Sequence, residues 1–83
     1  MVTKIFSIHD DKVGVYSQPY FMQHKGQMIR AFSDEVNNPE SQFCKHPGDF
    51  SLYYLGEFDD NSGGLSVLAQ PEFIANATEF KSK

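Results

Sequence analysis

The chain has 83 residues, which suffices for one small domain and excludes a multidomain enzyme or a repeat array. Hydrophobic residues make up 40% of it, aromatic residues 14% and charged residues 22%, a globular composition rather than a disordered or fibrous one. The single cysteine, Cys44, excludes an internal disulfide. No apolar run approaches the ~18 residues of a membrane span, and the first nine residues lack the features of a signal peptide. We therefore expect a single domain over residues 1–83, in the cytoplasm and without membrane contact.

The size of the chain also bears on its assembly. So short a chain buries only ~60% of the surface that its unfolded form exposes, which leaves a thin margin of stability. It carries eight phenylalanines and four tyrosines, more than one small core can enclose. A partner chain adds burial where disulfides and metal sites do not. These observations predict a homo-oligomer.

Charge is divided unevenly along the sequence. Residues 1–31 hold four basic and two acidic side chains, a net charge of +2, whereas residues 32–83 hold three basic and nine acidic side chains, a net charge of −6. The whole chain is at −4. Non-specific affinity for nucleic acid rests on clustered Lys and Arg, so any such contact is expected in the first third of the chain.

The first third of the chain predicts two strands. Residues 2–8 alternate and are rich in β-branched and aromatic side chains, which is typical of a strand. A polar turn at 9–12 leads to a short second strand at 13–16, and Pro19 interrupts strand pairing. The apolar segment 20–22 is expected to be extended and packed over the sheet.

One amphipathic helix is predicted over residues 25–37. Apolar side chains recur there at three- and four-residue spacing, at Met28, Ile29, Phe32 and Val36. Pro39 ends this helix because the residue before a proline is pushed out of the α region. Residues 39–49, rich in proline, glycine and polar side chains, are expected to form a loop.

The second half predicts a β-hairpin and a tail. Residues 50–58 and 65–70 are expected to be strands, and residues 59–64 supply the turn chemistry, including glycines that tolerate positive φ, between them. Pro71 is expected to end the hairpin. Residues 72–83 are then a loosely docked tail, in which Phe73, Ile74 and Phe80 form either a short strand or one helical turn.

The order of these elements, β-β-α-β-β, predicts the fold class. Short hairpins favour an antiparallel sheet of about four strands, with the single helix packed on one face. The sequence therefore predicts a small α+β domain.

Motifs for metal binding and catalysis fail on spacing. Residues 59–64 resemble the start of a calcium loop, but position twelve is Gln70 rather than a glutamate, and no helices flank the loop. Cys44 and His46 lie too close in sequence for zinc ligands and lack an oxyanion-hole motif beside them. Nucleotide-binding glycine motifs do not occur. We expect no enzymatic activity, no cofactor and no metal site.

Cations and aromatic residues interleave between residues 12 and 30. Mixtures of this kind bind single-stranded nucleic acid, because bases stack on aromatic faces and phosphates meet Lys or Arg. The same aromatic residues are typical of a core or of a subunit interface, and the low number of basic residues favours that interpretation. The candidate nucleic-acid-binding residues are Lys12, Tyr16, Tyr20, Phe21, Lys25 and Arg30.

Nearly the whole sequence resembles one known family. The segments that carry the resemblance are residues 4–7 (KIFS), 18–23 (QPYFMQ), 25–37 (KGQMIRAFSDEVN), 47–60 (PGDFSLYYLGEFDD) and 79–81 (EFK). They are similar to the small nonstructural protein of gokushoviruses, which are single-stranded DNA phages of the microvirus family.

The resemblance implies a function. It implies a non-catalytic protein made in the host cytoplasm and absent from the virion, which binds DNA and regulates the switch from duplex replication to single-stranded genome synthesis and packaging. Its partners would be single-stranded DNA and phage or host replication proteins. The acidity of the chain favours an alternative, an adaptor that contacts the replication initiator or host replication proteins without binding DNA. In that alternative Tyr20, Phe21 and Tyr53 or Tyr54 form an apolar contact surface.

Overall fold

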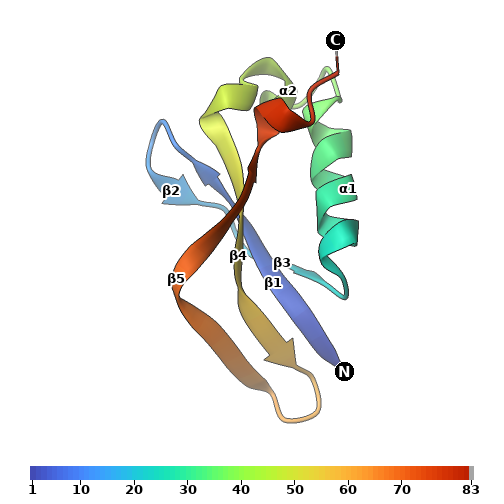
Figure 1. Cartoon of the computed structure of the whole chain (residues 1–83), viewed down its shortest axis with the longest axis vertical. Helices are drawn as coiled ribbons and strands as arrows, with labels where there is room; N and C mark the ends of the chain where they lie inside the picture. Colours follow the sequence, from blue (N-terminus) through green and yellow to red (C-terminus); the bar gives the residue numbers. More distant parts are fainter. Residues whose placement is uncertain (83) are drawn as a thin grey trace.

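Strand β1 (Val2–Asp10) lies inside the sheet, and its alternating side chains define the two faces. The computed structural model describes residues 1–82. In it, β4 (Phe50–Asp59) pairs antiparallel with the whole of β1, from Val2 opposite Asp59 to Asp10 opposite Phe50. This long pairing joins the N-terminal strand to the second half of the sequence in one sheet (Figure 1).

Two short strands share the other edge of β1. Strand β2 (Val15–Tyr16) pairs with its end, and β3 (Tyr20–Met22) pairs with Lys4, Ile5 and Phe6. The prediction that 20–22 is extended is confirmed, but the prediction that it packs over the sheet is wrong, because it hydrogen-bonds as an edge strand. The predicted second strand is also shorter, because β1 extends to Asp10 and the turn lies at residues 11–14.

Strand β5 (Gly64–Asn76) forms the opposite edge of the sheet, paired with β4. The predicted hairpin is confirmed, and Gly63 in its turn has a φ of 74°. The prediction that Pro71 ends the strand is wrong. The proline lies in an irregular stretch between two paired segments of an edge strand, where a missing N–H is tolerated. Phe73 and Ile74 are therefore strand residues.

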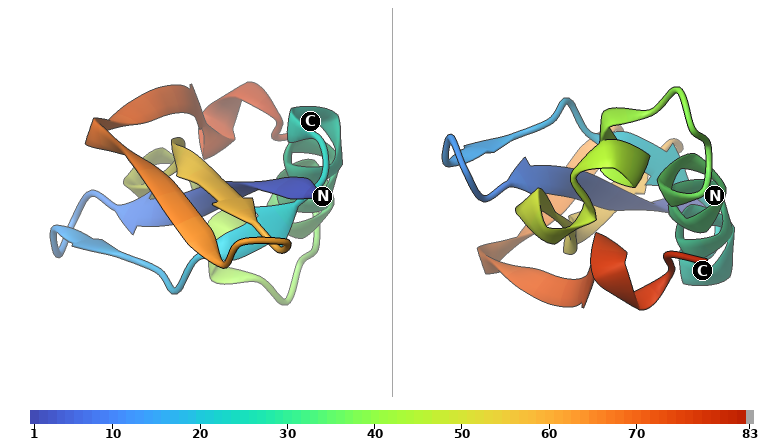
Figure 2. Two further views of the ribbon diagram at one scale, coloured as in Figure 1. Left: turned by 90° about the horizontal axis from the view of Figure 1, so that it is seen from below. Right: turned by 90° about the horizontal axis from the view of Figure 1, so that it is seen from above.

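Helix α1 (Lys25–Val36) packs on one face of the curled sheet (Figure 2), which confirms the predicted helix and the α+β class. Met28, Phe32 and Val36 lie on its buried stripe. The core joins them to side chains from the two central strands and from the C-terminal segment, namely Phe6, Ile8, Leu52 and Ala77. The helix stripe and the two β1 residues Phe6 and Ile8 thus bury one another.

The segment predicted as a loop at 39–49 contains two short helical turns, α2 (Gln42–Lys45) and η1 (Pro47–Asp49). Ser41 caps α2, since its side chain accepts a hydrogen bond from the Phe43 backbone N–H at 3.1 Å. A last turn, η2 (Ala77–Glu79), follows β5. No helix within residues 1–82 has the length and apolar character needed to cross a membrane.

Gly56 permits the sharp bend at which β5 crosses β4. An extra residue, Leu55, interrupts the register of β4 beside it, and the backbone of β5 approaches closely there. A Cβ at Gly56 would lie 2.2 Å from the Ser66 carbonyl oxygen and 2.7 Å from Val67 Cα. Any other residue would therefore push the two strands apart.

We expect Gly56→Ala to lower the free energy of unfolding by roughly 2 kcal/mol or more, because backbone cannot move aside as a flexible side chain can. Urea unfolding followed by circular dichroism measures this change.

Gly26→Ala is the matched control. Gly26 lies in α1 with nothing within 4 Å of the added methyl group, so the substitution should raise stability by about 0.5 kcal/mol through helix propensity. Equal stability of the two variants would contradict the role assigned to Gly56.

Candidate functional site

The face of the sheet opposite α1 carries a row of aromatic and apolar side chains, several of which are exposed. Phe6 and Ile8 of β1 point into the core, so Thr3, Ile5 and His9 point to the other face. Directly opposed residues in an antiparallel pair share a face, which extends this row across the neighbouring strands. The row divides into two parts of different chemistry.

The first part, the aromatic cluster, comprises His9, Tyr16, Tyr53 and Phe73. Ring centroids are 4.4 Å apart for His9 and Tyr16, and 5.5 Å apart for Tyr16 and Tyr53. Phe73 continues the cluster at 5.7 Å from Tyr53. Tyr16 is 46% exposed and Phe73 is 54% exposed, so the cluster presents open ring surface to solvent.

Hydrogen bonds hold the edge of the aromatic cluster in place. Asp11 Oδ1 lies 2.6 Å from His9 Nδ1, and Asp11 Oδ2 accepts a hydrogen bond from Ser51 Oγ at 3.1 Å. Asn76 Nδ2 donates to the same Ser51 Oγ at 3.1 Å. The Asp11 carboxylate is therefore engaged on both oxygens, and the His9 ring is held against Tyr16.

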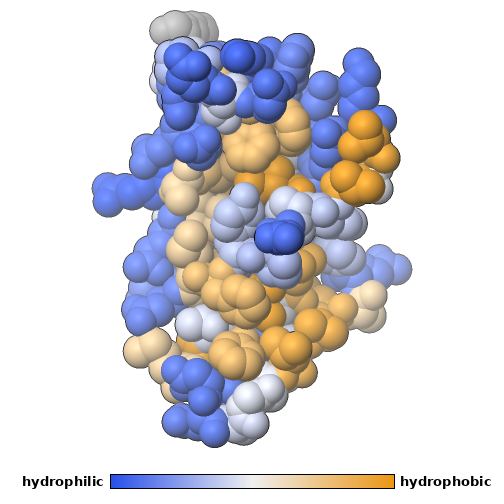
Figure 3. All heavy atoms as spheres, turned by 180° about the vertical axis from the view of Figure 1, so that it is seen from behind, coloured by the Kyte–Doolittle hydropathy of each residue, from blue (hydrophilic) through white to orange (hydrophobic). Residues whose placement is uncertain are grey.

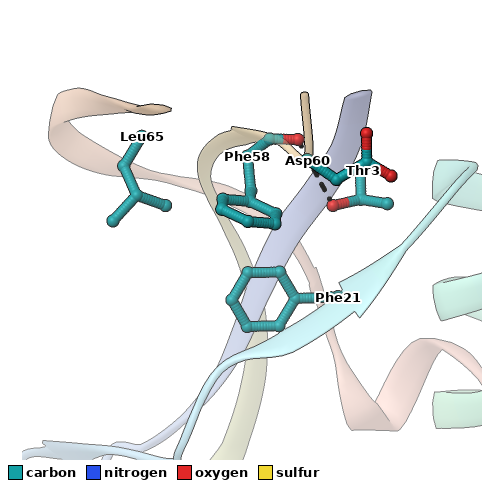
Figure 4. Close-up of a pocket in the computed structure, with 5 residues that line it drawn as sticks. All are labelled: Thr3, Phe21, Phe58, Asp60 and Leu65. Carbon is teal, nitrogen blue, oxygen red and sulfur yellow. Dashed lines mark hydrogen bonds between the residues drawn. The ribbon is translucent and has the colours of Figure 1, made fainter. Parts of the chain in front are cut away.

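The second part, the apolar patch, comprises Phe21, Phe58, Leu65 and Val67. The Phe21 and Phe58 rings meet edge to face at 6.0 Å, and Leu65 lies opposite Phe58 in the sheet. With Thr3 and Asp60, three of these residues line an open hollow of about 480 Å³ (Figure 4). Seen from behind, apolar surface covers the molecule just above the polar β4–β5 turn (Figure 3).

The structure separates the aromatic residues that the sequence grouped together. Tyr16 belongs to the aromatic cluster and Phe21 to the apolar patch. Tyr20 pairs with Phe6 and lies on the α1 side, where it lines a small hollow with Met22 and Met28. Alternation along β3 therefore places Tyr20 and Phe21 on opposite faces.

The three predicted cations are also dispersed. Lys12 is exposed in the turn between β1 and β2, four residues before Tyr16. Lys25 begins α1 and lines a hollow with Lys4, Tyr54 and Glu72, and Arg30 is exposed farther along the helix. Of the six predicted residues, Tyr16 is thus a member of the aromatic cluster, and Lys12 lies on the same hairpin as Tyr16. The other four lie elsewhere on the molecule.

Residues that the sequence did not single out complete both parts. His9, Phe58, Phe73, Leu65 and Val67 were not candidates. The signal for two of them was the hairpin itself, because strands joined by the turn at 59–64 place Phe58 opposite Leu65. Phe73 carried no such signal, since the expected end of the strand at Pro71 removed it from the sheet.

The calcium-loop-like segment 59–64 forms the β4–β5 turn, and Cys44 lies in the short helix α2. Within residues 1–82 no three His, Cys, Asp or Glu side chains are placed to hold a metal ion. Asp59 Oδ1 accepts a hydrogen bond from the Asn61 backbone N–H at 2.9 Å within the turn, and Asp60 pairs with the N-terminal ammonium of Met1 at 2.5 Å. Cys44 Sγ lies 2.8 Å from Lys81 Nζ.

The aromatic cluster raises the pKa of the Tyr53 phenol above its ordinary value of 10.0, chiefly because burial disfavours the phenolate, and further because Tyr16 and Asp11 would repel it. Absorbance at 295 nm should show a tyrosine that titrates above pH 10 in the wild type and is missing in Tyr53→Phe, whereas Tyr20→Phe should retain it. The raised pKa stabilises the fold below about pH 10 and this contribution is lost as pH rises through the folded pKa, so Tyr53→Phe should lose less stability in alkali. An unchanged titration in Tyr53→Phe would contradict the assignment.

Comparison with known proteins gives one match. The model of a family described as "Phage ORF5 protein" matches residues 3–80, nearly the whole chain. No curated protein and no solved structure matches this chain. The match covers every helix and, apart from Val2, every strand described above, so the chain belongs to the Phage ORF5 protein family.

Proposed function

We propose that this protein is a non-catalytic accessory protein of a gokushovirus that binds single-stranded DNA and regulates the switch from duplex replication to single-stranded genome synthesis and packaging. Two observations support the viral part of the proposal. The matched family is a phage family, and the segments quoted above resemble the nonstructural protein of these single-stranded DNA phages. In this proposal the protein acts in the host cytoplasm and is absent from the virion.

The aromatic cluster carries the DNA-binding part of the proposal. Exposed rings on an open sheet face are the platform on which unpaired bases stack, and stacking contributes ~1–3 kcal/mol per base with little regard to sequence. Tyr16 and Phe73 expose about half of their surface while Tyr53 holds them in place from between. Tyrosine and histidine rings suit such a wet surface because each combines an apolar face with a polar edge.

Lys12 is the proposed phosphate contact of this site. It is exposed at the tip of the hairpin that carries Tyr16, so a strand stacked on the aromatic cluster would pass close to its ammonium group. Lys25 and Arg30 lie on α1, across the sheet, and would not reach the same nucleotides. With few phosphates neutralised, we expect weak binding with a shallow salt dependence, about −0.7 per phosphate contacted on a logarithmic plot.

The test is fluorescence anisotropy of a labelled oligothymidylate titrated with protein at low and moderate salt. Tyr16→Ala should weaken binding about tenfold, the loss of one stacked base. Tyr20→Ala is the matched control, because it removes a tyrosine from the other face of the same edge of the sheet and should leave affinity unchanged.

The charge variants locate the phosphate contact. Lys12→Glu should weaken binding and flatten its salt dependence, whereas the double variant Lys25→Glu/Arg30→Glu should do neither. The reverse result would assign phosphate contact to α1. Absence of binding at low salt by folded protein would overturn the DNA-binding proposal.

The distribution of charge favours a second candidate, an adaptor without DNA binding. The net charge of −6 over residues 32–83 suits contact with a basic protein, such as a replication initiator or a host replication protein. Affinity purification from infected cells with and without nuclease tests this candidate. Partners that persist after nuclease treatment support it, and partners recovered only with nucleic acid present count against it.

A further inference from the structure

The apolar patch has the chemistry of a protein contact rather than of a nucleic-acid contact. Its members are hydrocarbon and phenyl side chains, and Phe21, Leu65 and Val67 are 51%, 63% and 68% exposed. The one charged residue lining the adjoining hollow is Asp60, whose carboxylate pairs with the Met1 ammonium. Because the Met1 ammonium there is already paired with Asp60, a phosphate would have to compete with that carboxylate, and the patch is distinct from the proposed DNA site.

The molecule exposes a large number of apolar side chains for the size of its core. Eleven large apolar or aromatic side chains are exposed among the described residues, against nine hydrophobic residues in the core. With ~150–250 Å² for a whole aromatic side chain as a scale, the three most exposed members of the patch present on the order of 300 Å² per molecule. This is within the range of the largest apolar patch on a monomer, which is often a functional contact.

The patch combines exposed side chains with a hollow. The β4–β5 hairpin projects at one end of the molecule (Figure 1), and its residues Leu65 and Val67 are exposed. Beside them lies the hollow between Phe21 and Phe58, with room for about 480 Å³ (Figure 4). A surface that offers both exposed side chains and a hollow can pair with itself about a two-fold axis, each copy filling the other.

The distribution of charge favours a second copy of this protein as the molecule that binds the apolar patch. Two copies at −4 each repel one another over most of their surfaces. The members of the apolar patch are uncharged, and the Asp60 charge at its rim is paired with the N-terminus, near which Asp59 also lies, so the hydrocarbon surfaces of two patches can meet with little electrostatic cost. An acidic partner would meet only the Met1 ammonium here, which is already paired, and a basic partner would find only Asp59 and the paired Asp60.

We infer that two copies of this protein form a two-fold symmetric dimer through the apolar patch, with Leu65 and Val67 of each copy inserted toward Phe21 and Phe58 of the other. With on the order of 300 Å² of apolar surface per copy, the contact is well below the ~800 Å² per partner of a standard interface and therefore associates weakly. The aromatic cluster stays outside it, so each dimer carries two copies of the proposed DNA site and would bind longer strands by avidity.

Sedimentation equilibrium over a wide range of protein concentration tests the dimer. The wild type should shift from monomer to dimer at micromolar or higher concentration, and added salt should favour the dimer by screening repulsion. Leu65→Glu/Val67→Glu should raise the dimer dissociation constant on the order of 100-fold, because these side chains form the buried centre of the contact. Circular dichroism checks that the variant is folded, which we expect because both residues are exposed.

Val13→Glu is the matched control, since Val13 is 66% exposed but lies in the β1–β2 turn, outside the patch. It should dimerise almost as the wild type does. A wild type that stays monomeric at every concentration, or a double glutamate variant that dimerises unchanged, would overturn the inference. DNA binding by monomeric protein separates the two proposals, because the stacking site lies within one copy.

Discussion

A single helix of twelve residues covers only one face of the sheet, and this limit governs the rest of the molecule. Helix α1 closes the core over Phe6, Ile8 and Leu52. The other face has no comparable cover, although the alternation of β1, β4 and β5 places rings and aliphatic side chains on it. Among the residues that the structure describes, Tyr16, Phe21, Leu65, Val67 and Phe73 stay exposed, so this face is available for contacts with other molecules.

The face opposite α1 is not uniform, and the difference follows from which strands supply it. Near the β1–β2 turn, the His9 ring is held by its hydrogen bond to Asp11, which Ser51 also contacts, and the Tyr16 and Tyr53 rings pack against it. Toward the β4–β5 turn, the side chains are leucine, valine and phenylalanine. Rings with polar edges tolerate exchange of water for bases, whereas the hydrocarbon surface gains most from a dry contact.

The sequence predicted the elements that rest on local pattern. The periodicity of Met28, Phe32 and Val36 and the stop at Pro39 located α1 within a residue, and the glycines at 63 and 64 located the hairpin. It failed where tertiary context overrides a local signal. A proline at position 71 predicts the end of a strand. In the structure, an edge strand with an irregular register accommodates Pro71 and continues to Asn76.

The site was harder to predict than the fold because a face depends on register rather than on proximity in sequence. Tyr20 and Phe21 are neighbours in the chain, and their separation onto opposite faces follows only once β3 is known to pair with β1. Phe73 joins Tyr53 through a pairing in which four residues of β5, 68–71, are skipped. No pattern within either strand encodes that skip, which depends on the close approach of β5 at Gly56.

An acidic chain that binds single-stranded DNA is physically consistent if stacking, rather than charge, supplies most of the affinity. Stacking acts at contact distance and is insensitive to net charge, whereas repulsion of phosphates by dispersed carboxylates is screened over about 10 Å at 0.1 M salt. Salt should then act in opposite directions on the two proposed contacts. It weakens the Lys12–phosphate contact and strengthens the meeting of two molecules at −4, so higher salt favours dimers that hold DNA mainly through their rings. A protein of this kind would hold a strand loosely and release it without a large electrostatic barrier, which suits a factor that acts on replication and leaves before the genome is packaged.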